Sequence, residues 1–556
     1  MHLAPRTGMR RRVAPRAVVR AVVGTVVGAL LVSSCAVGGA EPAPAQAGAA
    51  AGGPRAGAAG VAGPSSDARP AWAGGGARPV LTHVSRAMLP TAPARGGRPN
   101  ILLITADDQT DTEMRWMPRT RRLLTRAGID FPDAVNPHPL CCPARAEILT
   151  GEYAQNNGVR HNTGRFGGYE TFMRHNATSN LATWMRGAGY RTALVGKMMN
   201  GYPGRNARRM PGWDFWSPIS GGIYDYFGST FVNNGDPLTT SRSTHSSDVI
   251  SRETVRLITT YARQRKPFFI WASHVGPHDA TDRRGRWGPP PAAARHAGLF
   301  RRTLPPNRDK PSVTDPRLAG KPSAVKRLAR RGLADQTVLF RHRIRNLQAI
   351  DEANAAAIRA LRRTGELADT VVVYTSDNGY LLGEHGVSTK DLPYEEALQI
   401  PLSMRGPGIK RGTRSTETAS MVDLAPTFLD YAGVLGKVRR QGRTDGETLR
   451  PVIAGRARLS DTTLTQAGTA EPRKVAAFGW EWRGVRTGRY TYTRWWNGFE
   501  ELYDRDVDPY QQVNLHRDAR YAAVLGDLRS RYRRLADCAG LEECERQDFG
   551  ADPTPS

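Results

Sequence analysis

From Arg98 onward, the chain alternates short apolar runs with longer stretches in which apolar residues recur at helical spacing. Four runs have the length of buried strands, namely those in PNILLITADD, YRTALVGKMMNG, KPFFIWASHVGPHD and DTVVVYTSDNG. The stretch IRNLQAIDEANAAAIRALRRTGEL, which precedes the fourth run, has the pattern of a long helix. This alternation predicts an α/β fold with a mostly parallel central sheet and helices on both faces.

The pattern changes near residue 455. The segment VAAFGWEWRGVRTGRYTYTRWWNGFEELYD alternates aromatic and polar residues between glycine-containing turns, which is typical of a small antiparallel sheet. A charged helical stretch, YAAVLGDLRSRYRRLADC, follows it. We therefore expect a main domain over residues 98–455 and a smaller C-terminal subdomain over residues 456–556. The Pro- and Arg-rich region 280–340 is expected to be a surface insertion with little regular structure.

The N-terminal 35 residues have the layout of a secretory signal, with a basic start, a Val-rich apolar run and small residues before Cys35. The residues around Cys35 are similar to a bacterial lipoprotein cleavage box, so lipidation of Cys35 is expected. The alternative is an ordinary signal peptide with an incidental cysteine. Residues 36–97 are dominated by Ala, Gly and Pro and predict a disordered linker. The expected location is the outer face of the cytoplasmic membrane, through a lipid anchor, or the secreted fraction.

The formal net charge of +28 fits an anionic partner, although only nine of the 79 basic residues are Lys and an arginine-biased composition explains the charge equally well. The basic residues are scattered, and no nucleic-acid-binding motif accompanies them. An exported chain also has little access to nucleic acid. We therefore expect an anionic substrate or polymer and no nucleic-acid partner.

The five cysteines fall into three groups. Cys35 belongs to the signal, and Cys538 with Cys544 lies in DCAGLEEC near the C-terminus, where a short-loop disulfide is expected in an oxidising compartment. Cys141 and Cys142 are adjacent, which does not suit a mutual disulfide, and zinc-ligand spacing is absent around them.

Polar residues follow each of the four predicted strands. In open α/β sheets, ligands bind outside the carboxyl ends of the strands. Oxygen ligands gathered there suit Ca²⁺ or Mg²⁺, although each residue alone could equally belong to a turn or a cap; these residues are Asp107, Asp108, Asp377 and Asn378. The groups that suit a tetrahedral oxyanion, each of which could alone be an ordinary loop residue, are Lys197, His278 and Lys390.

The stretch PLCCPARAEILTG resembles the sulfatase signature, in which Cys-x-Pro-x-Arg is followed by Thr-Gly. The matching positions are Cys141, Pro143, Arg145, Thr150 and Gly151. Further similar segments are ITADDQ, GKMMNGY, TSDNGYLLGEHG, KDLPYEEALQIPLSMRGPGIK and ELYDRDVDP. The Cys-Cys pair and GKMMNGY are most similar to the branch of N-acetylglucosamine-6-sulfatases and extracellular heparan sulfatases. The resemblance implies an alkaline-phosphatase-like fold.

The resemblance also implies that a formylglycine-generating enzyme oxidises Cys141 to formylglycine, whose hydrate is the nucleophile. One hydroxyl would attack sulfur, and the second would then expel sulfate by re-forming the aldehyde. Arg145 would orient this group. The metal, usually Ca²⁺ with Mg²⁺ as the alternative, would be held by Asp107, Asp108, Asp377, Asn378 and residue 141. Sulfate would be bound by Lys197, His278 and Lys390, with His278 or Lys390 protonating the leaving oxygen.

Two positions depart from the family pattern. Met199 stands where many sulfatases have a histidine, so the base for the second step is open, with His161 and His385 as candidates. Ala144 replaces the commoner serine of the signature. The predicted activity is hydrolysis of sulfate monoesters of sulfated sugars or aryl sulfates. The rivals are a phosphomonoester or phosphonate monoester hydrolase on the same scaffold and a non-catalytic lipoprotein that binds polyanions.

Overall fold

The computed structural model describes residues 97–204, 209–264, 266–282, 284–330 and 335–556. The predicted signal, Cys35 and nearly all of the predicted linker therefore lie outside the described residues. None of the helices in the described part of the chain has the length and hydropathy of a membrane span.

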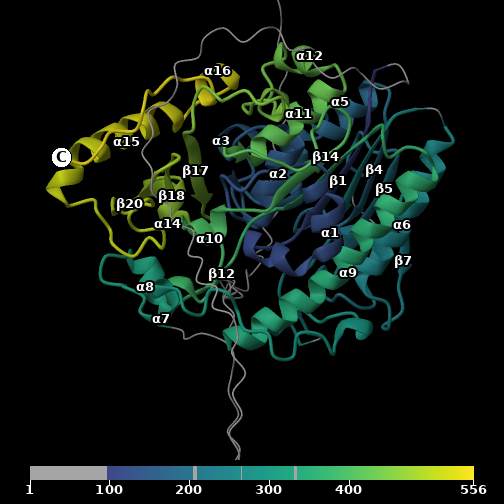
Figure 1. Ribbon diagram of the computed structural model, residues 1–556, viewed down its shortest axis with the longest axis horizontal. Helices are drawn as coiled ribbons and strands as arrows, with labels where there is room; N and C mark the ends of the chain where they lie inside the picture. The colour runs from purple at the N-terminus through teal and green to yellow at the C-terminus, as the bar shows by residue number, and fades with distance from the viewer. Residues whose placement is uncertain (1–96, 205–208, 265, 283, 331–334) are drawn as a thin grey trace, which may run out of the picture. The chain divides into compact units, whose positions relative to one another are not determined.

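A ten-stranded sheet forms the centre of the fold (Figure 1). The four predicted strands are neighbours at its middle, in the order β11 (Thr370–Ser376), β1 (Asn100–Ala106), β8 (Phe268–Ser273) and β4 (Arg191–Gly196). All three pairings between them are parallel, and β5 (Phe215–Ser220) continues the parallel arrangement beyond β4. The prediction of a mostly parallel central sheet is confirmed.

The remaining strands extend the sheet on both sides and bring in antiparallel pairs that the apolar runs did not indicate. Next to β5 lie β6 (Thr230–Asn233) and β7 (Asp236–Thr239), which form a hairpin. Next to β11 lie β14 (Leu402–Arg405), β2 (Ile129–Asp130) and β15 (Thr413–Arg414). These strands are short or exposed, so they carry little of the hydrophobic pattern that marks a buried strand.

Alternate residues of β1 enter two different hydrophobic cores, as the period of a strand requires. Ile101 and Leu103 pack with α2 (Cys141–Thr150), α5 (Leu181–Gly187) and α11 (Leu424–Tyr431). Leu102 and Ile104 pack with α6 (Ser246–Ala262) and α9 (Gln336–Arg363). Helices thus cover both faces of the sheet, as predicted.

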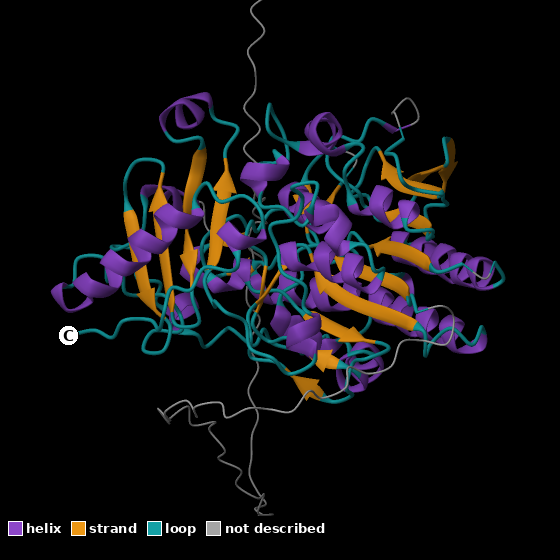
Figure 2. Ribbon diagram, turned by 90° about the horizontal axis from the view of Figure 1, so that it is seen from above, coloured by secondary structure: helices purple, strands orange, loops and turns teal. Residues whose placement is uncertain are grey.

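A second, four-stranded antiparallel sheet contains β17 (Thr463–Gly468), β18 (Trp480–Arg486), β19 (Tyr490–Trp495) and β20 (Glu500–Asp504) (Figure 2). One face packs against α15 (Ala522–Leu535), and the other packs against Tyr394 and Leu398 of the main domain. The predicted small sheet and helix are present. The start of the aromatic segment was wrongly predicted as strand, because α14 (Pro472–Ala477) extends into it.

Within region 280–340, the described residues before α9 contain only short elements, and the long helix α9 begins inside the region, at Gln336. The short elements are β9 (Ala280–Thr281), β10 (Trp287–Gly288), a 3-10 turn (Ala294–His296), α7 (Pro311–Thr314) and α8 (Ser323–Ala329).

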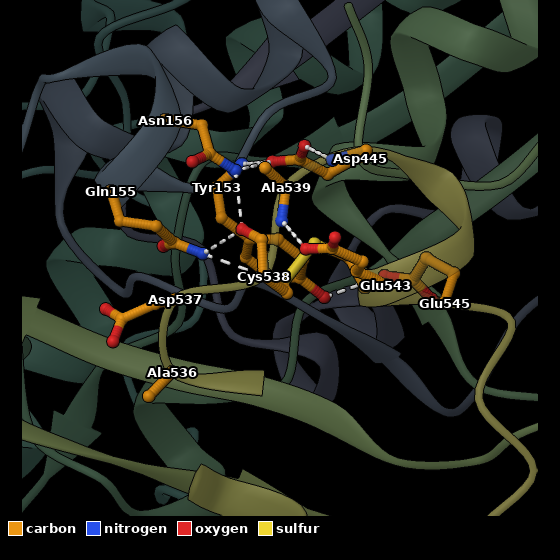
Figure 3. The surroundings of a disulfide bond; sticks show 12 residues. Tyr153, Gln155, Asn156, Asp445, Ala536, Asp537, Cys538, Ala539, Glu543 and Glu545 are labelled. Atoms are coloured by element: carbon orange, nitrogen blue, oxygen red, sulfur yellow. Dashed lines mark hydrogen bonds between the residues drawn. A yellow bond between two sulfur atoms is a disulfide. The ribbon is translucent and has the colours of Figure 1, made fainter. Parts of the chain in front are cut away.

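The expected disulfide joins Cys538 to Cys544 (Figure 3). The carbonyl oxygen of Cys538 accepts a hydrogen bond from Asn156 Nδ2 at 2.9 Å. Asp445 accepts one from the backbone N–H of Gly540 at 2.8 Å and one from that of Tyr153 at 2.7 Å. The C-terminal loop is thereby fastened to the segment that directly follows α2.

Candidate active site

The carboxyl ends of the four central strands bring the predicted polar residues to one edge of the sheet. Asp107 and Asp108 follow β1, while Asp377 and Asn378 follow the neighbouring strand β11. Lys197 follows β4, and His278 lies in the loop after β8. Lys390 reaches the same place from the loop after β13 (Ser388–Thr389). Apart from Lys390, the strand order alone explains why residues so distant in sequence meet here.

The helix α2 carries Cys141 at its first position and is buried along its whole length. Pro143 lies in the first turn, where a missing N–H is tolerated because those groups have no partner within the helix. The helix ends at Gly151, whose φ of +67° is a left-handed conformation that favours glycine. Thr150 donates its hydroxyl to the carbonyl of Ala146 at 2.8 Å. The Pro and Thr-Gly of the signature therefore shape the helix that presents residue 141.

Four potential ligand groups lie close together at the sheet edge. Ligand atoms of Asp107, Asp108, Cys141 and His278 all lie within 4.8 Å of one another. The side-chain oxygen of Asn378 is buried there and has no hydrogen-bond partner. A buried amide oxygen without a donor costs free energy unless something else binds it. Together with the carboxylates, this oxygen fits the all-oxygen surroundings that Ca²⁺ or Mg²⁺ prefers.

Arg145 contacts the carboxyl ends of three strands through hydrogen bonds and an ion pair. It lies one turn after Cys141 on α2 and is fully buried. Its Nε and Nη2 contact Asp377 Oδ2 at 2.9 and 2.8 Å. Its Nη1 donates to the carbonyl of Lys197 at 2.8 Å and to the hydroxyl of Ser273 at 2.7 Å. Arg145 therefore fixes the ends of β11, β4 and β8 relative to the helix.

Two lysines point at the same cluster. Lys197 is paired with Asp107, and Lys390 is paired with Asp108 and donates to Cys141 Sγ at 3.0 Å. Burial alone would lower both pKa values, but the neighbouring carboxylates raise the pKa of each lysine above its usual range. Both therefore stay charged at neutral pH. Gly196 allows this placement, because a Cβ there would lie 1.9 Å from the carbonyl oxygen of Ser273.

His278 faces Asp108 across 3.6 Å through Nε2, while Nδ1 lies 2.7 Å from the carbonyl oxygen of Asp279. Burial lowers the pKa of His278 to about 4, although Asp108 opposes the shift. Burial also raises the pKa of the Cys141 thiol to about 12, so the unmodified thiol stays protonated at neutral pH. A protonated thiol is a poor nucleophile.

The two carboxyls after β1 differ in their surroundings. Burial and the nearby Asp377 raise the pKa of Asp107 despite its contact with Lys197. At Asp108, the charges of Lys390 and His278 outweigh burial and lower the pKa below its usual value. The site thus combines two carboxylates with two ammonium groups around residue 141.

The other predicted residues lie as follows. Met199 is fully buried in the hydrophobic core, so its position serves packing here. The His161 ring bonds within its own loop to Thr163, and the His385 ring packs on Tyr394 at 4.1 Å. Within the described residues, no hydrogen bond or ion pair joins either ring to the cluster. Cys142 is buried, and its Sγ accepts from the backbone N–H of Asn200 at 3.2 Å.

Arg343 supports the cluster, but it belongs to no sequence motif, so its position near the site was not predicted. This buried residue of α9 donates to Glu113 at 2.7 and 2.8 Å. It also donates to the backbone carbonyl of Asp108 and, at 3.4 Å, to that of Pro277. Tyr224 was missed as well, and it contacts both Lys197 and His278.

This arrangement suits the binding of a tetrahedral anion, because residue 141 at the start of α2 lies between a group of potential metal ligands and two charged lysines. The sequence profile of the sulfatase family matches residues 99–434, and that of the N-sulphoglucosamine sulphohydrolase C-terminal region matches residues 383–537. The chain belongs to the sulfatase family.

Individual relatives agree with the family profile. An extracellular sulfatase SULF-1 homologue of Drosophila melanogaster is 33% identical over 389 residues, which cover 66% of this chain and 32% of that one. Human N-acetylglucosamine-6-sulfatase is 29% identical over 382 residues, covering 65% and 66%. The chain spans about half or less of the length of the extracellular sulfatases it matches.

A solved structure of a protein with its substrate, D-glucosamine-2-N,6-O-disulfate, superposes with a TM-score of 0.62. It is 25% identical and the match covers 78% of this chain and 96% of that one. The likeness agrees with the alkaline-phosphatase-like architecture.

Proposed function

We propose that this chain is an exported sulfatase that hydrolyses sulfate monoesters of sulfated amino sugars through residue 141, after oxidation of Cys141 to formylglycine. The observation that carries the proposal is the convergence of Lys197, Lys390 and His278 on Cys141. Three positive or hydrogen-bonding groups around one nucleophile position suit a tetrahedral anion whose charge must be neutralised during attack.

The divalent cation, with Ca²⁺ as the first choice, is assigned to the oxygens of Asp107, Asp108, Asp377 and Asn378 and to residue 141. The partnerless Asn378 oxygen supports this assignment. Formylglycine would supply a hydrated aldehyde with one hydroxyl for attack on sulfur and a second for release of sulfate, while the cation would polarise these oxygens. Arg145 orients residue 141 by holding Asp377 and the carbonyl of Lys197.

Lys197 and Lys390 bind the oxygens of the sulfate group because both keep their protons at neutral pH. The proton for the departing alcohol comes from Lys390 or His278. Comparing two substrates distinguishes the candidates, because loss of the general acid lowers activity more when the leaving group is poor. We expect the acid's variant, Lys390→Met or His278→Gln, to lose at least about tenfold more activity on a sugar sulfate than on an aryl sulfate with a good leaving group. Equal losses on both substrates would assign that residue to binding only.

The substrate class is supported by the names of the relatives. One relative is an N-acetylglucosamine-6-sulfatase, and the superposed structure holds a glucosamine disulfate. We therefore assign glucosamine-derived sulfate esters as the natural substrates, with aryl sulfates as accessory ones.

The location and the chain organisation complete the proposal. The extracellular relatives support export. Residues 1–35 are assigned as a lipoprotein-type signal with Cys35 lipidated, and residues 36–97 as a linker. Residues 98–455 form the catalytic domain and residues 456–556 the C-terminal subdomain. A formylglycine-generating enzyme is the maturation partner.

The central test combines peptide mass spectrometry with activity. We expect a peptide in which Cys141 is converted to formylglycine, and we expect Cys141→Ala to release no sulfate from glucosamine-6-sulfate. Cys142→Ala is the matched control, because it removes the neighbouring thiol and should retain most activity. Full activity with an unmodified thiol at 141 would refute the mechanism. Faster turnover of a phosphate ester than of the matched sulfate ester would instead favour a phosphomonoesterase.

A further inference from the structure

The loop between β5 and β6 places an aromatic side chain against two of the assigned sulfate-binding groups. Tyr224 accepts a hydrogen bond from Lys197 Nζ at 3.3 Å. Its ring stacks on His278 with the centroids 4.1 Å apart and the planes 16° from parallel. One side chain therefore contacts both groups at once, although they come from different strands.

We propose that Tyr224 is a further residue of the sulfate pocket, which holds Lys197 and His278 in place and donates its hydroxyl hydrogen to an oxygen of the anion. This inference rests on the proposed function, because the anion is the sulfate group of the substrate.

The donor direction follows from the contacts of the hydroxyl. Its oxygen accepts from Lys197 Nζ and, at 3.2 Å, from Asn200 Nδ2. A phenol has one hydrogen to donate and two lone pairs to accept with, so both lone pairs are engaged. The hydrogen is then directed away from Lys197 and Asn200. Burial raises the pKa of Tyr224 above its usual range, so the hydroxyl keeps this hydrogen at neutral pH.

The contact with Tyr224 also fixes the orientation of the Lys197 ammonium group. An ammonium group has three hydrogens. One is used by Asp107 and one by Tyr224, which leaves the third for an oxygen of the anion. The Lys197 ammonium also lies 4.9 Å from the centre of the Tyr224 ring, within the range of a cation–π interaction.

The loop itself is anchored next to His278. Tyr226, two residues after Tyr224, donates its hydroxyl to the carbonyl of His278 at 2.5 Å, and its oxygen lies 3.2 Å from the carbonyl oxygen of Val275. The backbone N–H of Thr281 donates to the carbonyl of Tyr224 at 3.3 Å. Trp287 packs at the edge of the Tyr224–His278 pair, 5.3 and 5.7 Å from the two rings. Tyr224 is thus held in place before substrate binds, which is what a positioning residue requires.

The test compares Tyr224→Phe, which keeps the ring and removes the hydroxyl, with the matched control Tyr190→Phe. The hydroxyl of Tyr190 donates to the carbonyl of Pro99 at 2.9 Å, at the opposite edge of the sheet. For Tyr224→Phe we expect the inhibition constant of inorganic sulfate and the KM of a sulfate ester each to rise about 10- to 100-fold, the range for one hydrogen bond to a charged group. Formylglycine content and thermal stability should equal those of Tyr190→Phe, which should bind sulfate like the wild type.

A second variant isolates the stacking. Tyr224→Leu removes the ring as well, so kcat should fall at least about fivefold below that of Tyr224→Phe because His278 loses its support. Equal kcat in the two variants would overturn the stacking role.

Direct titration of sodium sulfate into the proteins by calorimetry separates this inference from the proposed function. Wild-type protein that hydrolyses no sulfate ester, yet binds sulfate more tightly than Tyr224→Phe, would refute the proposed function and support the role of Tyr224. Equal sulfate affinity in the wild type and in Tyr224→Phe would overturn the role of Tyr224, whatever the activity.

Discussion

The buried pair of Arg343 and Glu113 connects the stability of the fold to the geometry of the active site. Both side chains are fully buried, and two hydrogen bonds of 2.7 and 2.8 Å join them. Arg343 also holds the backbone carbonyls of Asp108 and Pro277. The perturbation is a double-mutant cycle with Arg343→Met, Glu113→Gln and the combined variant.

The expected magnitudes follow from these contacts. Removing one member of a buried pair leaves the other charge without compensation, which costs about 3–5 kcal/mol of the free energy of unfolding. In Arg343→Met, Glu113 still accepts a hydrogen bond from the backbone N–H of Thr110 at 3.0 Å. The loss of unfolding free energy in this variant should therefore lie at the lower end of that range. In the combined variant neither charge remains, and the loss should fall short of the sum of the single losses by at least about 2 kcal/mol.

The assay is urea unfolding together with turnover of a sulfate ester per folded molecule. Even where the combined variant recovers stability, the carbonyls of Asp108 and Pro277 still lack their donor. Turnover should then stay at least about tenfold below the wild type, because small displacements of reacting groups are costly. Arg458→Met is the control: this buried arginine pairs with Asp423 and Glu545 away from the site, so its loss should lower stability and spare turnover. Additive losses, or wild-type turnover in the combined variant, would refute the reasoning.

Three further predictions concern pH, the disulfide and the metal. His245 caps α6 through Nδ1, which accepts from the N–H of Ser247 at 3.2 Å, and burial lowers its pKa from 6.5 to about 4. Between these pH values the unfolded chain therefore binds more protons at His245 than the folded protein does. The contribution of neutral His245 to the free energy of unfolding is complete above pH 6.5, and up to about 3 kcal/mol of that free energy is lost as the pH falls through 4. His245→Asn should flatten that slope in urea unfolding, and an unchanged slope would contradict the cause. Replacing Cys538 and Cys544 by serine should lower the free energy of unfolding by about 2 kcal/mol and leave turnover intact, whereas an unchanged unfolding midpoint would argue against a stabilising role. A chelator should abolish turnover and added Ca²⁺ should restore it; full activity after metal removal would refute the cation assignment.

The sequence predicted the parts of the fold that depend on long apolar runs. The four central strands and α9 were found because each buries a continuous hydrophobic pattern. The strands β2 and β15 have only two residues each and carry no such pattern. Residues 475–477 of α14 were assigned to the predicted sheet because these apolar residues lead directly into the aromatic segment.

The candidate site could be predicted where residues follow a strand or belong to the signature. Asp107, Asp377 and Lys197 were found in this way. Tyr224 and Arg343 were not, because one lies in an irregular loop and the other faces the site from a helix whose pattern reports only burial. Their roles depend on which strands are neighbours, and that information is absent from any local segment.

If Cys141 is oxidised to formylglycine as proposed, the complete burial of α2 has a consequence for the timing of that step. All ten residues from Cys141 to Thr150 are buried, and Cys141 itself has no exposed surface. A protein catalyst must surround its target residue, and it could not do so once the strands, α5 and α11 have packed around this helix. Oxidation of Cys141 would therefore have to occur on the newly made chain, before folding, and chains that fold first would remain permanently inactive. The fraction of active molecules would then depend on the relative rates of folding and oxidation as well as on the amount of protein produced.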